Sequence, residues 1–162
     1  MRLQYLGADL FEADVFLLEL ESWSDWPATL SLPSRHFRLL TVGDAGRVGG
    51  EELSRFADAA IGAGCVFLCA WGTGCMRVHD TFDYQDLELP HGAAVMTSSH
   101  ADESLEDAIE FLLISAWPDK AFVETCRAAL IAVVDDGSLA DQVKSLALRF
   151  MRPSDRPGET MN

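Results

Sequence analysis

The chain has 162 residues, of which 49% are hydrophobic and 23% are charged, so it can bury the core of one domain and is short for two. Asp and Glu number 26 against 12 Lys and Arg, which gives a net charge of -14 at pH 7. This charge repels phosphate backbones and anionic lipid surfaces, so we expect neither nucleic-acid nor membrane binding; it serves solubility or selects a basic protein partner.

The first part of the sequence, residues 1–35, shows no clear hydrophobic period and is expected to be irregular. Val15–Leu20 fits either a strand or a short helix, and the tryptophans and prolines that follow it indicate an aromatic-rich connection. Acidic residues interrupt the apolar run that a signal peptide needs, so we expect a cytoplasmic protein.

From residue 36 onward, the patterns of strands and helices alternate. The runs 37–42 and 65–70 are apolar and β-prone, and each is followed by glycines and then by a helical pattern that starts near Glu51 or after Gly74. The uncharged stretch 59–76 has the length of a membrane span, but its glycines divide it into a helix end, a short strand and a turn.

The alternation continues in the second half. Residues 93–96 predict a short strand, Ser104 predicts the N-cap of a helix that ends before Pro118, residues 128–134 predict another strand, and Ser138 opens a last helix. These elements predict a single α/β domain over residues 1–152, a three-layer sandwich whose mostly parallel sheet of four to five strands is flanked by helices. Residues 153–162 are predicted to form a flexible tail.

Residues with distinctive chemistry follow each predicted strand. In open parallel sheets, ligands bind beyond the carboxyl ends of the strands, so these residues are expected to meet at one edge. The candidate ligand contacts there are Trp71, Gly72, Gly74, Ser98, Ser99, Asp135 and Asp136.

The stretch 65–80 contains most of the cysteines and supplies the catalytic candidates. Cys75 falls in the first turn of a predicted helix, where backbone N–H groups and the helix dipole stabilise a thiolate, and His79 follows one turn later beside Asp80. His100, after the next strand, completes this candidate set. No known nucleophile motif surrounds Cys75, so the alternative is a buried strand, a glycine turn and a helix start without catalytic function.

Metal and cofactor sites are less well supported. Cys69, Cys75, His79 and His100 are ligand types that suit zinc, but their spacing is not a common structural zinc pattern. Arg77 occupies the place of the third glycine in a dinucleotide fingerprint that would start at Gly72. We therefore expect no metal and no cofactor, and we expect the cysteines to be reduced thiols.

A family resemblance adds to these patterns. The run Cys69-Ala70-Trp71-Gly72, then Cys75, Val78-His79-Asp80 and the helix start Ser104–Ala108, resembles a family of small uncharacterised bacterial α/β proteins. The resemblance covers residues 36–118. It implies a domain of unknown function from a bacterial cytoplasm, and it carries over no catalytic residue.

The function expected from these observations is binding. The net charge, together with an acidic face around Asp102, Glu103 and Glu106, favours an acidic protein that docks a basic partner, such as an immunity protein or an accessory protein of a defence operon. The alternative is a hydrolase or transferase that uses Cys75 and His79 at the carboxyl edge of the sheet. The sequence does not predict an oligomeric state.

Overall fold

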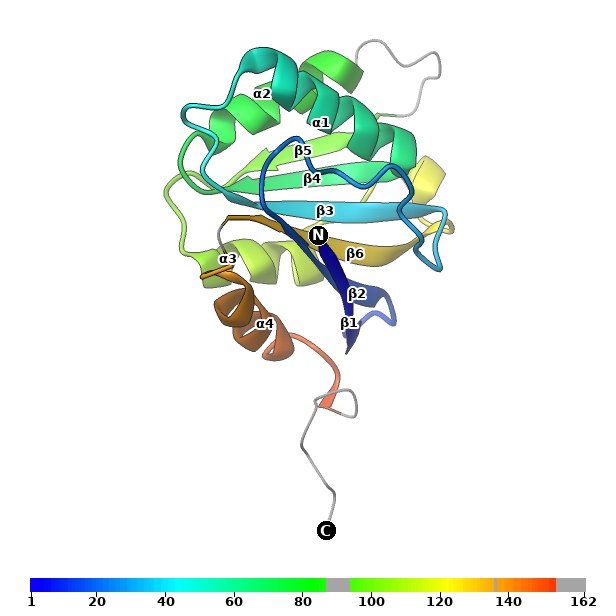
Figure 1. The fold of residues 1–162 in the computed structure, drawn as a ribbon. Coiled ribbons are helices and arrows are strands. Elements are labelled where there is room, and N and C mark those ends of the chain that lie inside the picture. Colours follow the sequence, from blue (N-terminus) through cyan, green and yellow to red (C-terminus); the bar gives the residue numbers. More distant parts are fainter. Residues whose placement is uncertain (87–93, 136, 154–162) are drawn as a thin grey trace.

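The centre of the structure is a six-stranded sheet, which Figure 1 shows between two groups of helices. This computed structural model describes residues 1–86, 94–135 and 137–153. The strands have the order β1-β2-β6-β3-β4-β5, in which β1 is antiparallel to β2 and every other pairing is parallel. Their bounds are β1 (Arg2–Ala8), β2 (Asp14–Leu20), β3 (His36–Gly43), β4 (Cys65–Trp71), β5 (Met96–Ser99) and β6 (Cys126–Val134).

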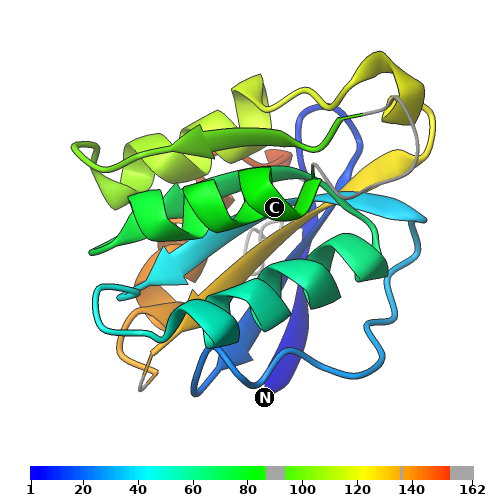
Figure 2. The same ribbon diagram turned by 90° about the horizontal axis from the view of Figure 1, so that it is seen from above.

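Helices cover both faces of the sheet (Figures 1 and 2). α1 (Gly50–Ala63) and α2 (Cys75–Asp86) pack on one face, around a core cluster that includes Phe56 and Phe82. On the other face, α3 (Leu105–Glu110) continues into the π-helical turn η1 (Phe111–Ser115) and packs with α4 (Ala140–Leu148). A short 3-10 helix, η2 (Lys120–Phe122), precedes β6. The expected α/β class with a mostly parallel sheet is confirmed.

Local sequence explains most of these elements. The middle strands are apolar and buried along nearly their whole length, as strands covered on both faces must be. α1 carries Glu51 and Glu52 in its first turn and ends at Gly64, whose φ of 115° is a left-handed cap conformation. Ser104 caps α3 as predicted, because its side chain accepts a hydrogen bond from the Asp107 N–H at 3.0 Å. Within the described residues, no helix is long and apolar enough to cross a bilayer.

Residues 1–35 differ most from expectation. The sequence predicts an irregular segment, whereas β1 and β2 add two strands, so the sheet has six strands instead of four to five. β2 is parallel to β6 and lies inside the sheet, where its side chains alternate between burial and partial exposure. That alternation is short, and the aromatic connection after it obscures the period. Residues 22–35 do contain no helix or strand.

Two boundaries in the second half are also corrected. β5 starts at Met96 rather than at residue 93, because its ladder with β4 pairs Phe67 with Met96 and continues through the serines; residue 93 itself lies outside the described residues. α4 begins at Ala140, and its N-cap residue is Leu139 rather than the predicted Ser138, with no side-chain cap hydrogen bond; one Asp135 carboxylate oxygen accepts the Leu139 N–H at 3.1 Å. Of the predicted tail, residues 154–162 lie outside the described residues.

A buried ion pair joins the central strand β3 to the turn after the edge strand β1. Arg38 lies on the central strand β3, and its Nη2 is 2.8 Å from Oδ2 of Asp9, which follows β1. The side chains are 9% and 0% exposed. The other Arg38 nitrogen, Nη1, donates to the Leu112 carbonyl in η1 at 2.6 Å, and Asp9 accepts the N–H groups of Phe11 and Ala13. Both charges are therefore compensated by hydrogen bonds as well as by each other.

We expect Asp9→Ala to lower the free energy of unfolding by about 3–5 kcal/mol, because it leaves the Arg38 guanidinium charged and unpaired in the core. Urea denaturation followed by circular dichroism measures this loss. Glu12→Gln is the control, since Glu12 pairs with Arg152 at the surface and its loss should cost less than about 1 kcal/mol. Equal losses in the two variants would show that the buried pair has no special importance.

Candidate functional site

At the carboxyl ends of β3 and β4, where the sequence places part of its ligand contacts, the two following loops pack closely together. Gly72 has a φ of 113°, and a Cβ atom there would lie 2.3 Å from the Gly43 carbonyl oxygen. Gly74 has a φ of 74° and a similarly close approach to the Gly46 N–H nitrogen, at 2.6 Å. The Ala45 N–H donates to the Thr73 carbonyl at 2.8 Å. Gly72 and Gly74 thus let the backbone segments after β3 and β4 touch.

Arg77 strengthens the same closure from the first turn of α2. Its guanidinium donates to the carbonyls of Ala45 and Val48, the latter at 2.7 Å, in the loop between β3 and α1. The Trp23 indole N–H donates to the Asp44 carbonyl at 3.0 Å from the other side. The loop after β3 is therefore held over the strand ends by side chains that the sequence gives no reason to connect.

Cys75 lies in the hydrophobic core beneath α2. Its side chain is 3% exposed and belongs to the cluster between the sheet and the α1–α2 layer. Its Sγ is 3.7 Å from the Ser99 hydroxyl. His79, one turn later, makes its hydrogen bonds to carboxylates instead. The structure thus favours the alternative in which Cys75 is a core residue, and it does not bring Cys75 and His79 together as a nucleophile and base.

His79 forms a small cluster with two carboxylates on the outer side of α2. Its Nδ1 is 3.0 Å from Asp80 Oδ1 and 3.6 Å from Asp83 Oδ2. Asp83 also accepts a hydrogen bond from the Thr97 hydroxyl on β5, at 2.5 Å. One ligand atom from each of the three residues lies within 4.8 Å of the others, which is the spacing of a cation site. The side chains of Asp80 and Asp83 are 70% and 49% exposed, so solvent also reaches these carboxylates.

His100 is part of a second network, on the opposite face of β5. Its Nε2 is 2.9 Å from the Ser98 hydroxyl, and its Nδ1 is 2.5 Å from Oε2 of Glu103. His100 is 3% exposed, and its ring packs against Phe111 with the centroids 4.7 Å apart. The Trp71 indole N–H donates to the Glu103 carbonyl at 2.8 Å. Four candidates that the sequence lists separately, Trp71, Ser98, His100 and Glu103, are therefore in one hydrogen-bonded chain.

The remaining acidic candidates have different roles. Glu106 pairs with Arg149 of the segment after α4 at 3.0 Å, so part of the charge on α3 is already neutralised. Asp102 is exposed at the start of α3. Asp135 is occupied by the N–H groups of Gly137 and Leu139 at the start of α4. Asp136 lies outside the described residues.

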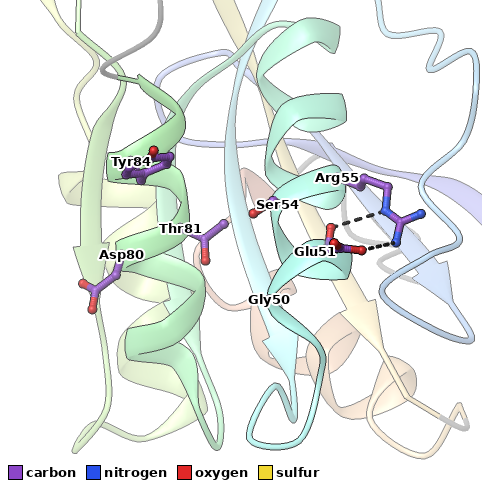
Figure 3. Close-up of a pocket in the computed structure, with 7 residues that line it drawn as sticks. All are labelled: Gly50, Glu51, Ser54, Arg55, Asp80, Thr81 and Tyr84. Atoms are coloured by element: carbon purple, nitrogen blue, oxygen red, sulfur yellow. Dashed lines mark hydrogen bonds and ion pairs between the residues drawn. The ribbon is translucent and has the colours of Figure 1, made fainter.

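A groove between α1 and α2 has a volume of about 710 Å³ (Figure 3). One wall comes from α1 and the other from α2, and its lining residues are Gly50, Glu51, Ser54, Arg55, Asp80, Thr81 and Tyr84. Arg55, the cation in this lining, turns back to Glu51 at 3.9 Å. The sequence pattern identifies Asp80 but not the groove; the exposed face of α2, with Asp80 and Tyr84 one turn apart, is the signal that would have found it.

The comparisons with known proteins identify the family and nothing further. The model of the family described as "Domain of unknown function (DUF7684)" matches residues 15–149, and the chain belongs to this family. Comparison with curated proteins found no match, and comparison with solved structures found none. The expected resemblance to an uncharacterised family is confirmed, and the function has to be inferred from the residues.

We expect the thiols to react slowly in the folded protein. Burial raises the pKa of Cys126 to about 11 and that of Cys69 to about 12, and it raises the pKa of Cys65 still further. A raised pKa keeps the thiol neutral until the pH approaches that value, so at pH 8 the thiolate fraction of Cys126 is roughly 0.1%. Reaction with a disulfide reagent such as DTNB should be at least about 100-fold slower than for free cysteine, and should accelerate as the pH rises or in urea.

The same titration tests the expected nucleophile. After partial reaction with iodoacetamide at pH 6.5, peptide mass spectrometry locates the first thiol to be alkylated. We expect no thiol of the protein to be alkylated faster than free cysteine under these conditions. Rapid alkylation of Cys75 would show that its thiol is activated and reachable, and would restore the Cys75 hypothesis.

Proposed function

We propose that this member of the DUF7684 family is a binding domain of three-layer α/β architecture that docks a basic protein in the groove between α1 and α2. The observation that carries the proposal is the charge of the groove. Its lining includes two carboxylates from different helices, Glu51 and Asp80, and these side chains are 96% and 70% exposed. These exposed carboxylates, one on each helix, are sites where a lysine or arginine side chain of a partner can pair, in competition with Arg55 beside Glu51.

The groove also offers an anchor for such a side chain. Tyr84 is 65% exposed and lines the same hollow, one turn after Asp80. An arginine that stacks on an aromatic ring while it meets a carboxylate gains both a cation–π contact and an ion pair. Tyrosine and arginine are also the residue types that most often dominate interface energies. The groove thus combines specificity for positive charge with a surface that packs.

The net charge supports the same partner at longer range. A charge of -14 speeds the approach of a basic protein and disfavours acidic ones, so it contributes to association rate and partner choice more than to final affinity. A role that fits is that of an immunity protein, or of an accessory protein of a defence operon, acting in a bacterial cytoplasm. In such a pair, the small acidic protein would bind the basic protein and keep it inactive.

The enzymatic alternative at Cys75 and His79 has weaker support. Cys75 is buried in the core and contacts Ser99, whereas His79 faces the carboxylates of Asp80 and Asp83 on the surface. A hydrolase or transferase at this position would require α2 to move before the thiol met a substrate.

We expect the double variant Glu51→Gln/Asp80→Asn to bind the partner at least about 10-fold more weakly, equivalent to about 1.4 kcal/mol. The tagged protein is used to capture partners from the native host at low salt, and isothermal titration calorimetry with the purified partner then gives Kd for both forms. The change removes two carboxylates from the groove and keeps the shape of both side chains.

The control variant is Glu124→Gln/Asp141→Asn, which makes the same change in net charge at exposed residues away from the groove. It should slow association slightly and change Kd by less than about 3-fold, which is the size expected for exposed surface charges. Equal weakening by the two double variants would mean that net charge alone attracts the partner. Failure to enrich any basic protein at low salt would contradict the proposal itself.

A further inference from the structure

We propose that Ser98, His100 and Glu103 form a nucleophile, base and acid relay that transfers acyl groups from small neutral or cationic esters. The proposal is independent of the binding groove, because these residues lie on the α3 side of β5 and the groove lies between α1 and α2. Figure 2 shows β5 at the edge of the sheet, between α2 and the helix formed by residues 105–115. The relay and the groove can therefore succeed or fail separately.

The hydrogen-bond pattern assigns the protons within the relay. A carboxylate only accepts, so the 2.5 Å contact with Glu103 requires that His100 carry its proton on Nδ1. In the tautomer that the proposal uses, Nε2 has a lone pair that can accept from the Ser98 hydroxyl, whose oxygen is 2.9 Å away. This is the order of atoms in which a histidine removes the proton from a serine nucleophile while an acid holds the ring in the required tautomer.

The fold holds each member of the relay on a different support. Ser98 lies on β5 and pairs in register with Cys69 of β4. The His100 ring packs on Phe111 of η1, and the backbone N–H of His100 donates to the Ala70 carbonyl at 2.9 Å. The loop that carries Glu103 is tied down by the Trp71 indole. A surface hydrogen bond formed by chance would have no such support from three separate elements.

The open edge of the sheet provides access and an oxyanion donor. Among residues 1–86, 94–135 and 137–153, β5 pairs with β4 alone and no described strand covers its outer edge, where Ser98 is half-buried. Because the His100 N–H points to Ala70 on β4, the N–H of the alternate residue Ser99 points away from β4 toward this open edge. In serine hydrolases the N–H of the residue after the nucleophile stabilises the oxyanion, and Ser99 is in that position.

The chemical step is ordinary acyl transfer. Ser98 Oγ attacks the ester carbonyl carbon and its proton passes to His100 Nε2. The tetrahedral intermediate expels the alcohol, which takes that proton as the ester C–O bond breaks, and leaves an acyl group on Ser98. Water then attacks the acyl carbonyl carbon, and its proton passes to Nε2. The bond between the acyl carbon and Ser98 Oγ breaks, Oγ takes this proton, and the carboxylic acid is released.

Local charge restricts the substrate. Asp102 and Asp107 are exposed beside the relay, at the start of α3, and Glu103 itself is 45% exposed on the same side. These carboxylates repel an anionic acyl group and favour a neutral or cationic one. Because Ser98 is itself half-buried, small acyl groups such as acetyl are favoured.

The test is covalent labelling of the full chain with an uncharged alkyl fluorophosphonate, followed by peptide mass spectrometry. We expect one adduct per chain, on Ser98, with none in Ser98→Ala and an unchanged rate in the exposed control Ser145→Ala. Hydrolysis of p-nitrophenyl acetate should exceed that of the anionic hemisuccinate ester at low salt, and the difference should shrink as salt screens the carboxylates.

The histidine and glutamate variants separate catalysis from bracing. His100→Asn should slow labelling at least about 100-fold and remove its rise with pH, because no base remains to accept the Ser98 proton. Glu103→Gln should slow labelling at least about 10-fold and alter the pH profile, whereas the exposed control Glu124→Gln should change neither. Circular dichroism confirms that each variant is folded. Absence of an adduct on Ser98 in the folded wild-type protein, or labelling that is equal in Glu103→Gln and wild type, would overturn the proposal.

Discussion

The position of Arg38 constrains everything on one side of the sheet. A charged side chain on the central strand is stable only if its charge and its N–H groups are all satisfied, because an uncompensated buried ion costs several kcal/mol. Asp9 supplies the charge, and the carbonyls of Leu112 and Ala116 accept from the same guanidinium. The ion pair therefore fixes the turn after β1 and the end of η1 relative to β3. Since η1 also carries Phe111, the support for the His100 ring depends on where Arg38 holds this helix.

Close backbone contacts at the carboxyl ends of β3, β4 and β6 limit where a ligand can bind. In many parallel sheets the strand ends leave a crevice for ligands. Here Gly43 lies so close to β6 that a Cβ atom would be 2.7 Å from the Val134 carbonyl, and Gly72 lies on Gly43 in turn. The glycines allow three chain segments to meet without a gap. Polar chemistry is consequently displaced from the middle of the edge to β5 at its end, where Ser98, Ser99 and His100 lie, and to the outer surface of α2.

Sequence periodicity predicted the parts of the fold that depend on local patterns. The buried strands β3, β4 and β6, the cap at Ser104 and the glycine end of α1 follow from hydrophobic runs and from backbone chemistry within a few residues. The sequence pattern does not reveal β1, because an edge strand with two buried residues, Leu6 and Gly7, has little hydrophobic signal. The Arg38–Asp9 pair was missed for a different reason: the residues are 29 positions apart, and no local pattern announces a long-range contact. Similarly, Ser98, His100 and Glu103 were each identified, but only strand pairing and the position of α3 show that they form one chain.

The alternation of β5 explains how one short strand can serve two unrelated surfaces. Successive side chains of a strand point to opposite faces, so Thr97 bonds to Asp83 of α2 while Ser98 bonds to His100 on the α3 side. Ser99, on the α2 side again, reaches the core thiol of Cys75. A shift of one residue in the β4–β5 register would exchange these partners and place Ser98 among the carboxylates of α2. Register is therefore the property that keeps a hydroxyl beside His100 and a threonine beside Asp83, and the β4 strand specifies it by pairing Cys69 with Ser98.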